Sequence, residues 1–379
     1  MTSKSIRFGA VGDVSLGDHP LCVGFGGYSE FRKRPASFPF NFVKTEFDKC
    51  DVLFGNLECA ISQSGVDPRS HDSVQMRGQA GFVDALSHAG FTVMNMANNH
   101  SLQHGEETFL ETRELLLDNE IQPVGVSTDS HRTAVPTVTE AHGVKLGFLG
   151  YSLRPRQYFE NNPIYSEGSR EGILRDTRLL RSNVDCVIVS LHWGDEFIHR
   201  PSPEEIQLAH EIIDAGAKLI IGHHPHVLRG IEHYGEGVIA YSLGNFVCDM
   251  LWDEALRETA ILQCNISKTG ISDLALLPCR IGNKYQPIPI EGPQLAAALD
   301  RIAKYSTGLS ESIGSDIRSI ERRYEDDANS VLRIIRRKSQ FFFLKNIVRY
   351  RTAILLQQVM RYFRNRIHEF AYRDPKAEN

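Results

Sequence analysis

Residues 219–226 read Leu219-Ile220-Ile221-Gly222-His223-His224-Pro225-His226, an apolar run followed by a cluster of histidines. Such a run, bounded by a glycine, is typical of a buried strand. The pair His224 and His226 therefore follows the end of a predicted strand, and imidazoles delivered at a strand end are good metal ligands. This stretch predicts a core strand and a metal site beside its end.

The same arrangement recurs along the chain, where other short β-like runs end in Asp, Asn, Glu or His. These are Ile6–Val11 before Asp13, Val52–Phe54 before Asn56 and Glu58, Thr92–Met96 before Asn99 and His100, and Val187–Leu191 before His192. Open α/β sheets bind ligands outside the carboxyl ends of their strands, so we expect these side chains to converge. Carboxylate, amide and imidazole ligands together suit Mn, Fe or Zn better than Ca. One or two ions are expected, and Glu58 is the preferred bridge between two ions ~3.5–4 Å apart.

Strand and helix patterns alternate through most of the chain, which indicates an α/β fold with helices covering a sheet. Predicted helices span Glu106–Asn119 and Pro203–Ala215, and later strands span Lys145–Tyr151, Val238–Leu243 and Thr259–Ile266. The polar stretches Asp18–Phe40 and Arg154–Ser169 are expected to be surface loops at the rim of a site. Strand patterns stop near Pro287–Pro293, which predicts one domain over residues 1–293 and a helical extension over 294–379.

Charge is distributed very unevenly over the 379 residues. Residues 333–366 carry ten Lys or Arg and no Asp or Glu, and because the whole chain has a net charge of −5, the rest of it carries −15. The seven cysteines are dispersed without a Cys-x-x-Cys motif, which favours free thiols in a reducing compartment. No apolar signal segment precedes the first strand. The expected location is the cytoplasm, either free or bound peripherally at the inner face of the membrane.

The C-terminal segment Phe341–Phe370 has apolar residues at helical spacing, with Lys345, Arg349, Arg361 and Arg364 between them. This pattern predicts a basic amphipathic helix. Its longest uncharged stretch, Thr352–Met360, has nine residues, well short of the ~20 that cross a bilayer. Three interpretations remain open: contact with anionic lipid, binding of an acidic polymer, or packing on the acidic domain or on a second copy in a homo-oligomer. No nucleic-acid partner is expected.

Six blocks of the sequence together resemble the CapA family of poly-γ-glutamate and capsule synthesis proteins. They are Gly12-Asp13, Asn56-Leu57-Glu58, Ala97-Asn98-Asn99-His100, His192-Trp193-Gly194, His224-Pro225-His226 and Tyr241-Ser242-Leu243-Gly244-Asn245-Phe246. That family is related to the calcineurin-like metallophosphoesterases. The resemblance therefore implies a β-sandwich flanked by helices, and it leaves the segment beyond Pro293 as a C-terminal helical extension.

The resemblance also implies roles for individual residues. Asp13, Asn99, His192, His224 and His226 take the positions of metal ligands, and His100 that of the general acid. Ser242 and Asn245 are expected to contact the substrate or to support the ligands, as is Asn56. Two departures from the phosphoesterase motifs matter: Asp13-Val14-Ser15 lacks the histidine of the Asp-x-His motif, and Asn56 stands where the bridging Asp would be. Gln103 replaces an Asp that the family usually carries after His100.

Two functions remain open on the sequence. The first is a metal-dependent hydrolase similar to CapA, with a metal-bound hydroxide as nucleophile and His100 as acid, acting on a phosphoester or an acidic polymer such as poly-γ-glutamate. The second is a non-catalytic accessory protein of capsule or polymer assembly that binds through the same cleft. The missing histidine after Asp13 and the Asn56 in place of a bridging Asp favour the accessory protein. The retained pair Asn99-His100 favours the enzyme.

Overall fold

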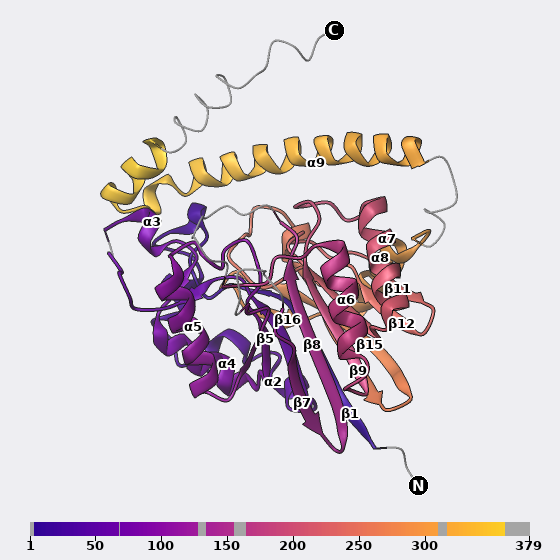
Figure 1. The fold of residues 1–379 in the computed structure, drawn as a ribbon. Helices are drawn as coiled ribbons and strands as arrows, with labels where there is room; N and C mark the ends of the chain where they lie inside the picture. Colours follow the sequence, from indigo (N-terminus) through magenta and orange to yellow (C-terminus); the bar gives the residue numbers. More distant parts are fainter. Residues whose placement is uncertain (1–3, 68, 128–133, 155–163, 310–316, 361–379) are drawn as a thin grey trace.

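Two β-sheets packed face to face form the centre of the molecule, and helices cover both outer faces (Figure 1). The structure is a computed structural model that describes residues 4–67, 69–127, 134–154, 164–309 and 317–360. The expected α/β class, a sandwich flanked by helices with further helices at the C-terminus, is confirmed.

The first sheet has the strand order β16-β15-β14-β1-β2-β5-β6, with β13 beside β1. Strands β1, β2, β5 and β6 are parallel to one another, so their carboxyl ends lie at the same edge. The strand bounds are β1 (Ser5–Val14), β2 (Val52–Leu57), β5 (Val93–Asn95), β6 (Gln122–Val124), β13 (Asn245–Val247), β14 (Glu258–Ser267), β15 (Gly270–Ile281) and β16 (Pro287–Pro289).

The second sheet has the order β11-β12-β10-β9-β8-β7, and its four strands β12, β10, β9 and β8 are parallel. The bounds are β7 (Thr137–Ala141), β8 (Val144–Ser152), β9 (Cys186–His192), β10 (Leu219–His223), β11 (Ile231–Tyr234) and β12 (Gly237–Ala240). A small separate sheet pairs β3 (Ala60–Ile61) with β4 (Arg77–Gly78). β12 ends three residues before the predicted Leu243, and the chain bends at Tyr241.

Alternating side chains divide each strand between two cores, as the period of a strand requires. In β1, Ile6, Phe8 and Ala10 face the space between the sheets, whereas Val11 and Val14 face the helices. The rings of Phe54 and Phe148 stack across the two sheets with centroids 5.9 Å apart. The inter-sheet core thus fixes how the strand ends of the two sheets meet.

The two helices predicted from the sequence, Glu106–Asn119 and Pro203–Ala215, are both confirmed. α5 (Glu106–Asp118) packs with α4 (Val83–Ala89) outside the first sheet, and α6 (Arg170–Leu180) with α7 (Pro203–Ala215) outside the second. α7 starts at the predicted Pro203, where Ser202 and Glu205 form a capping box. The short helices are α1 (Gly27–Phe31), α2 (Lys44–Phe47) and α3 (His71–Val74), with 3₁₀ turns at Pro20–Cys22, Phe38–Phe40, Ala80–Phe82 and Ala255–Arg257.

The prediction of a surface loop over Asp18–Phe40 is wrong for most of this segment. It contains α1 and two 3₁₀ turns, and its apolar residues Cys22, Val23, Phe25, Phe31 and Phe40 are buried. The carboxylate of Asp18 holds the segment internally by accepting from the Gly24 and Ser29 amides and the Ser29 hydroxyl. The second predicted loop, Arg154–Ser169, lies partly outside the described residues.

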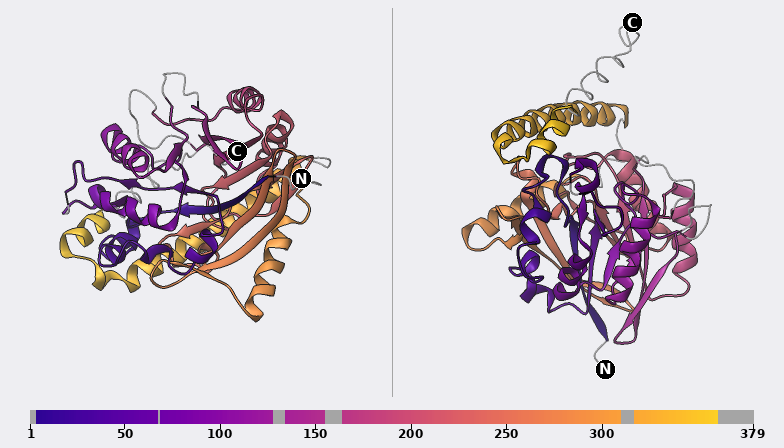
Figure 2. Two further views of the ribbon diagram at one scale, coloured as in Figure 1. Left: turned by 90° about the horizontal axis from the view of Figure 1, so that it is seen from below. Right: turned by 90° about the vertical axis from the view of Figure 1, so that its left-hand side faces the viewer.

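The chain after Pro293 is helical in the described residues. α8 (Pro293–Ser306) packs near β11 and β15, and the long α9 (Ile317–Lys345) lies across one end of the sandwich (Figures 1 and 2). The division into domains at residue 293 stays a prediction. None of the helices in the described ranges combines the length and apolarity that crossing a bilayer requires.

The predicted continuous helix Phe341–Phe370 is interrupted in its described part. α9 ends at Lys345, a 3₁₀ turn follows at Ile347–Arg349, and residues 352–360 form a new helix. The Asn346 side chain donates to the Phe342 carbonyl at 2.8 Å, and the Tyr350 hydroxyl donates to the Leu21 carbonyl at 2.7 Å. These bonds turn the chain onto the N-terminal segment. Residues 361–370 of the predicted helix lie outside the described residues.

Candidate functional site

Polar residues form a row across each sheet near the carboxyl ends of the parallel strands. In the first sheet Asp13 of β1 is in register with Asn245 of β13 and with Asn56 of β2, and Asn56 with Asn95 of β5. In the second sheet His192 of β9 is in register with His223 of β10. All of these side chains are buried. The sequence prediction that strand ends bring such residues together agrees with this geometry.

Asp13 lies at the centre of the site, and polar groups from both sheets surround it. Its Oδ1 accepts from Asn56 Nδ2 at 2.9 Å and from His223 Nδ1 at 3.1 Å, and its Oδ2 accepts from the His224 amide at 3.2 Å. Burial works to raise the pKa of this carboxyl, but the His223 hydrogen bond and the charges of His223 and His226 outweigh it and lower the pKa. Asp13 is therefore held as a carboxylate.

His223 is a site residue that is not among the ligands predicted from the sequence. Its Nδ1 bonds Asp13, and its buried Nε2 has no hydrogen-bond partner among the described residues. Strand alternation could have indicated it, because His223 and Ile221 share a face that points into the inter-sheet space.

The loop after β10 bends sharply enough to turn two imidazoles into the site. His224 has φ +93° and His226 φ +60°, a backbone region that residues other than glycine rarely adopt. Gly222 allows the close approach, because a Cβ at this position would lie 2.0 Å from the Tyr241 carbonyl oxygen. Such conformations cost free energy and persist only where the surroundings enforce them, as functional sites often do.

Glu58, His224 and His226 form a group whose ligand atoms all lie within 4.8 Å of one another. Each side chain is buried, and neither ring nitrogen of His224 nor Oε1 of Glu58 has a hydrogen-bond partner among the described residues. Burying polar atoms without partners is costly, so the arrangement fits a cation that they would share. Burial and the charges of Asp13 and Glu196 raise the pKa of Glu58, and a bound cation would reverse that effect.

His192 lies beside this group but has other partners. Its Nε2 donates to Asn99 Oδ1 at 2.9 Å and lies 3.5 Å from Glu58 Oε1. Burial lowers the pKa of His192 and of His224, so both rings are neutral, which is the form that ligates metals. The predicted ligands Asn99 and His192 thus bond each other and are adjacent to the Glu58 group.

The three predicted supporting residues have distinct surroundings. Asn56 donates to Asp13 and accepts from Asn95 Nδ2 at 2.9 Å, so it orients the carboxylate. Asn245 Oδ1 accepts from His226 Nδ1 at 2.9 Å, which leaves Nε2 of that ring for a ligand. The Ser242 hydroxyl donates to the Val227 carbonyl at 2.8 Å and accepts from the Gly244 amide. Ser242 therefore shapes the adjacent loop.

His100 lies at the edge of the site, and its Nδ1 is 2.6 Å from Gln103 Oε1. Because the amide oxygen only accepts, Nδ1 carries the proton and Nε2 is the free nitrogen of the neutral ring. Burial is the main cause that lowers the pKa of His100, to about 4. Gln103 therefore supplies the orienting acceptor that the family pattern assigns to an Asp.

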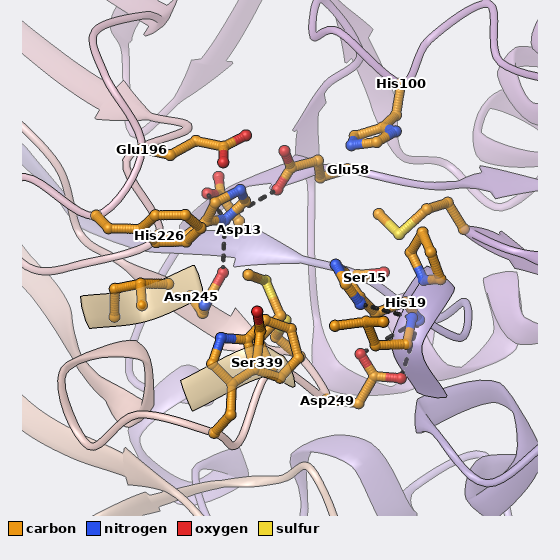
Figure 3. Close-up of a pocket in the computed structure, with 18 of the residues that line it drawn as sticks. Asp13, Ser15, His19, Glu58, His100, Glu196, His226, Asn245, Asp249 and Ser339 are labelled. Atoms are coloured by element: carbon orange, nitrogen blue, oxygen red, sulfur yellow. Dashed lines mark hydrogen bonds and ion pairs between the residues drawn. The ribbon is translucent and has the colours of Figure 1, made fainter. Parts of the chain in front are cut away.

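A cavity of about 420 Å³ opens beside these residues (Figure 3). Asp13, Glu58 and His226 line it together with Glu196, which is not among the site residues predicted from the sequence. Its apolar lining comes from distant segments, including Leu21, Met76, Phe197, Met250 and Trp252. α9 closes one side through Leu332, Ile335, Arg336 and Ser339.

The chain is similar in sequence to several known proteins. The chain is 27% identical over 312 residues to the capsule biosynthesis protein CapA of Bacillus anthracis, covering 80% of this chain and 72% of that protein. It is 29% identical over 290 residues to the PGA biosynthesis protein CapA of Bacillus subtilis, covering 75% and 74%. It is also 30% identical over 217 residues to a probable polyglutamine synthesis accessory protein of Mycobacterium tuberculosis, covering 52% and 56%.

The model of one protein family matches residues 7–250, which include every predicted site residue. This range is more than half of the chain, and it contains both rows of polar residues and the group around Glu58. The chain therefore belongs to the family described as bacterial capsule synthesis protein PGA_cap.

Proposed function

We propose that this chain is a metal-dependent hydrolase of capsule or poly-γ-glutamate synthesis. The observation that carries the proposal is the buried group of Glu58, His224 and His226, whose ligand atoms all lie within 4.8 Å of one another. Among them, Glu58 Oε1 and both ring nitrogens of His224 have no hydrogen-bond partner among the described residues. One or two ions of Mn, Fe or Zn suit these ligands. The biological context is supported by the family and by the names of the two Bacillus relatives.

In this proposal each part of the site has a task. Glu58, His224 and His226 hold the cation, with Asp13, Asn99 and His192 as the adjoining predicted ligands. When bound, the cation would activate water and polarise the scissile bond. Asn56 and His223 fix the Asp13 carboxylate, and Asn245 fixes the His226 ring, so the chain orients its ligands before any substrate arrives.

His100 remains the predicted general acid. In the free protein its Nε2 carries no proton at neutral pH, because the pKa is lowered to about 4 and the Nδ1 proton is directed to Gln103. To act as an acid, the ring must gain a second proton when an anionic substrate occupies the cavity and stabilises the imidazolium. Both proposed substrate classes, a phosphoester and an acidic γ-glutamyl polymer, supply such a charge.

A second function, a non-catalytic accessory protein of polymer assembly, has support of its own. Ser15 lines the cavity where the phosphoesterase motif has a histidine, and its buried hydroxyl has no hydrogen-bond partner among the described residues. The printed name of the Mycobacterium tuberculosis relative is that of an accessory protein. A site that binds an acidic polymer without cleaving it would need the cavity but not a proton donor.

The proposed location is the cytoplasm, either free or in contact with the inner face of the membrane. All seven cysteines lie in described residues and all are free, which suits a reducing compartment. Basic residues on the exposed side of α9 would face an anionic surface.

Turnover by variants separates the two functions. Purified protein would be loaded with Mn, Fe or Zn and assayed against phosphomonoesters, phosphodiesters and poly-γ-glutamate, with elemental analysis in parallel. For a hydrolase we expect His100→Ala to keep its metal and lose about 10²–10⁴-fold in turnover. His224→Ala should lose metal and turnover together. Equal metal loss in both variants would contradict the assigned roles, and an inactive but metal-loaded wild type would favour the accessory protein over the hydrolase.

A further inference from the structure

Helix α9 supplies one wall of the cavity that holds the candidate metal site. Its lining residues Leu332, Ile335, Arg336 and Ser339 are spaced i, i+3, i+4 and i+7, so they share one face of the helix. These residues lie more than 70 positions beyond Met250, where the family match ends. This wall therefore belongs to the part of the chain outside the family model.

Contacts on both sides of the cavity hold α9 in place. Near its start, the Tyr324 hydroxyl donates to Asp195 Oδ2 at 2.9 Å, beside the cavity residues Glu196 and Phe197. Further along, Lys338 forms an ion pair with Asp253 at 2.5 Å, and the Phe342 ring lies 5.5 Å from that of Trp252. The helix is thus tied to two loops that themselves line the cavity.

The turn after α9, at Arg349 and Tyr350, fixes a third lining segment. Tyr350 bonds the Leu21 carbonyl at 2.7 Å, and the Arg349 guanidinium stacks over the Phe25 ring at 4.2 Å. His19, Pro20 and Leu21 line the cavity, so their position depends on this contact. Figure 3 shows Ser339 of α9 well apart from the carboxylates of Asp13 and Glu58.

The charges around the cavity indicate a role for the wall formed by α9. Four carboxylates line the cavity, those of Asp13, Glu58, Glu196 and Asp249, and among the described lining residues Arg336 is the only Arg or Lys. A cation bound by Glu58 and the two histidines would form one positive point, and the guanidinium of Arg336 forms another. Arginine recognises carboxylate and phosphate groups through its planar fork of donors.

We propose that Arg336 binds an anionic group of the ligand, a carboxylate or a phosphate, while another part of the ligand lies at the Glu58 group. A cavity of about 420 Å³ is within the range of small-molecule sites, so it takes a small anion or the anionic end of a chain. The proposal rests on the proposed function only in placing the reacting end of the ligand at the metal group. α9 then determines which ligands this chain accepts.

The test compares Arg336→Gln with Arg337→Gln in the full-length protein. Arg337 is the next residue of the same helix, is exposed and does not line the cavity, so it controls for the loss of one positive charge. Calorimetric titration with tri-γ-glutamate and, separately, with inorganic phosphate measures affinity, and elemental analysis measures metal content. We expect Arg336→Gln to weaken the binding of at least one probe about five- to tenfold and Arg336→Lys to weaken it less. Arg337→Gln should change the affinity for that probe less than twofold.

The two probes identify the anion. A loss confined to tri-γ-glutamate identifies a carboxylate, and a loss confined to phosphate identifies a phosphate. Equal effects of Arg336→Gln and Arg337→Gln, loss of metal from Arg336→Gln, or a wild type that binds neither probe would overturn the inference. A wild type that binds a probe through Arg336 but turns over no substrate would keep the inference and refute the hydrolase.

Discussion

At the residue scale, the buried guanidinium of Arg229 holds the loop that brings Glu196 and Phe197 to the cavity. It donates to Glu205 Oε1 at 2.6 Å, to the Ile198 carbonyl at 2.7 Å and to the Asp195 carbonyl at 3.1 Å. Glu205 also caps the start of α7, so one carboxylate joins the helix to the loop. Removing either partner of such a pair leaves a buried charge uncompensated.

We therefore expect Arg229→Met to lower the free energy of unfolding by about 3–5 kcal/mol, measured by urea denaturation. The exposed pair of Arg170 and Glu211, which joins α6 to α7, is the matched control. Arg170→Met should cost less than about 1 kcal/mol, because solvent screens an exposed pair. Equal costs for the two variants would show that Arg229 does not act through its buried contacts.

A second residue-scale prediction concerns Asp249, whose pKa burial and the nearby charge of Asp18 raise to about 7. Between the unfolded value near 4 and this folded value, the folded protein holds a proton that the unfolded chain has lost. The contribution of Asp249 to stability therefore falls as pH rises from about 4 to 7. An asparagine side chain is neutral throughout, so the stability of Asp249→Asn relative to wild type should rise between pH 5 and pH 8.

Because each pH unit within this window is worth about 1.4 kcal/mol, the relative gain should be a few kcal/mol. Urea denaturation at pH 5, 6.5 and 8 measures it. Asp84→Asn on the exposed side of α4 controls for the change of charge. A stability difference that stays constant across the three pH values would refute the shifted pKa.

At the scale of elements, short apolar runs that end in polar residues were the basis of most of the strand prediction. Such runs identified β9 and β10, and the parallel carboxyl ends explain why Asp13 and His192 come from opposite sheets to one site. Strand alternation indicates that His223 faces the inter-sheet space, but its bond to Asp13 was not predictable, because the packing of the two sheets creates it. The wall formed by α9 was also not predictable, because its contacts join residues some 300 positions apart.

The C-terminal helices present two different surfaces. Ile354 and Tyr350 pack with Cys22, Val23 and Phe25 in a buried apolar cluster. Phe341 and Val348 are 69% and 87% exposed, in a segment that also carries Lys345 and Arg349. The packing interpretation of the tail thus has the buried cluster in its favour, while contact with an anionic membrane stays a prediction for the exposed face.

Point variants can separate these two surfaces. Ile354→Ser should lower stability by about 2–5 kcal/mol, because it removes a buried side chain from the cluster. Phe341→Ser and Val348→Ser should leave stability nearly unchanged and, if the exposed face contacts lipid, weaken sedimentation with phosphatidylglycerol vesicles. Vesicle binding by the wild type should also weaken as salt rises, since exposed charges are screened over ~8–10 Å. Vesicle binding that is unaffected by both exposed-face variants would exclude this face as the contact.

At the scale of the whole molecule, the candidate metal site joins the two sheets of the sandwich. Glu58 follows β2 of the first sheet, whereas His224 and His226 follow β10 of the second. Asp13 of the first sheet already bonds His223 of the second across the same interface. A cation shared by these ligands would therefore add a link between the halves of the fold, and its binding energy would appear as global stability.

We expect Mn or Zn to raise the thermal midpoint of the wild type by several degrees, because a ligand at 100 times its Kd stabilises the folded state by about 2.7 kcal/mol. Removing the metal with a chelator should reverse the shift. His224→Ala should lose the metal-dependent shift, and its metal-free midpoint gives separately the cost of removing a buried ring. His100→Ala should keep the shift, because His100 is outside the Glu58 group. Scanning calorimetry with and without metal measures all three proteins, and an undiminished shift in His224→Ala would place the cation elsewhere in the molecule.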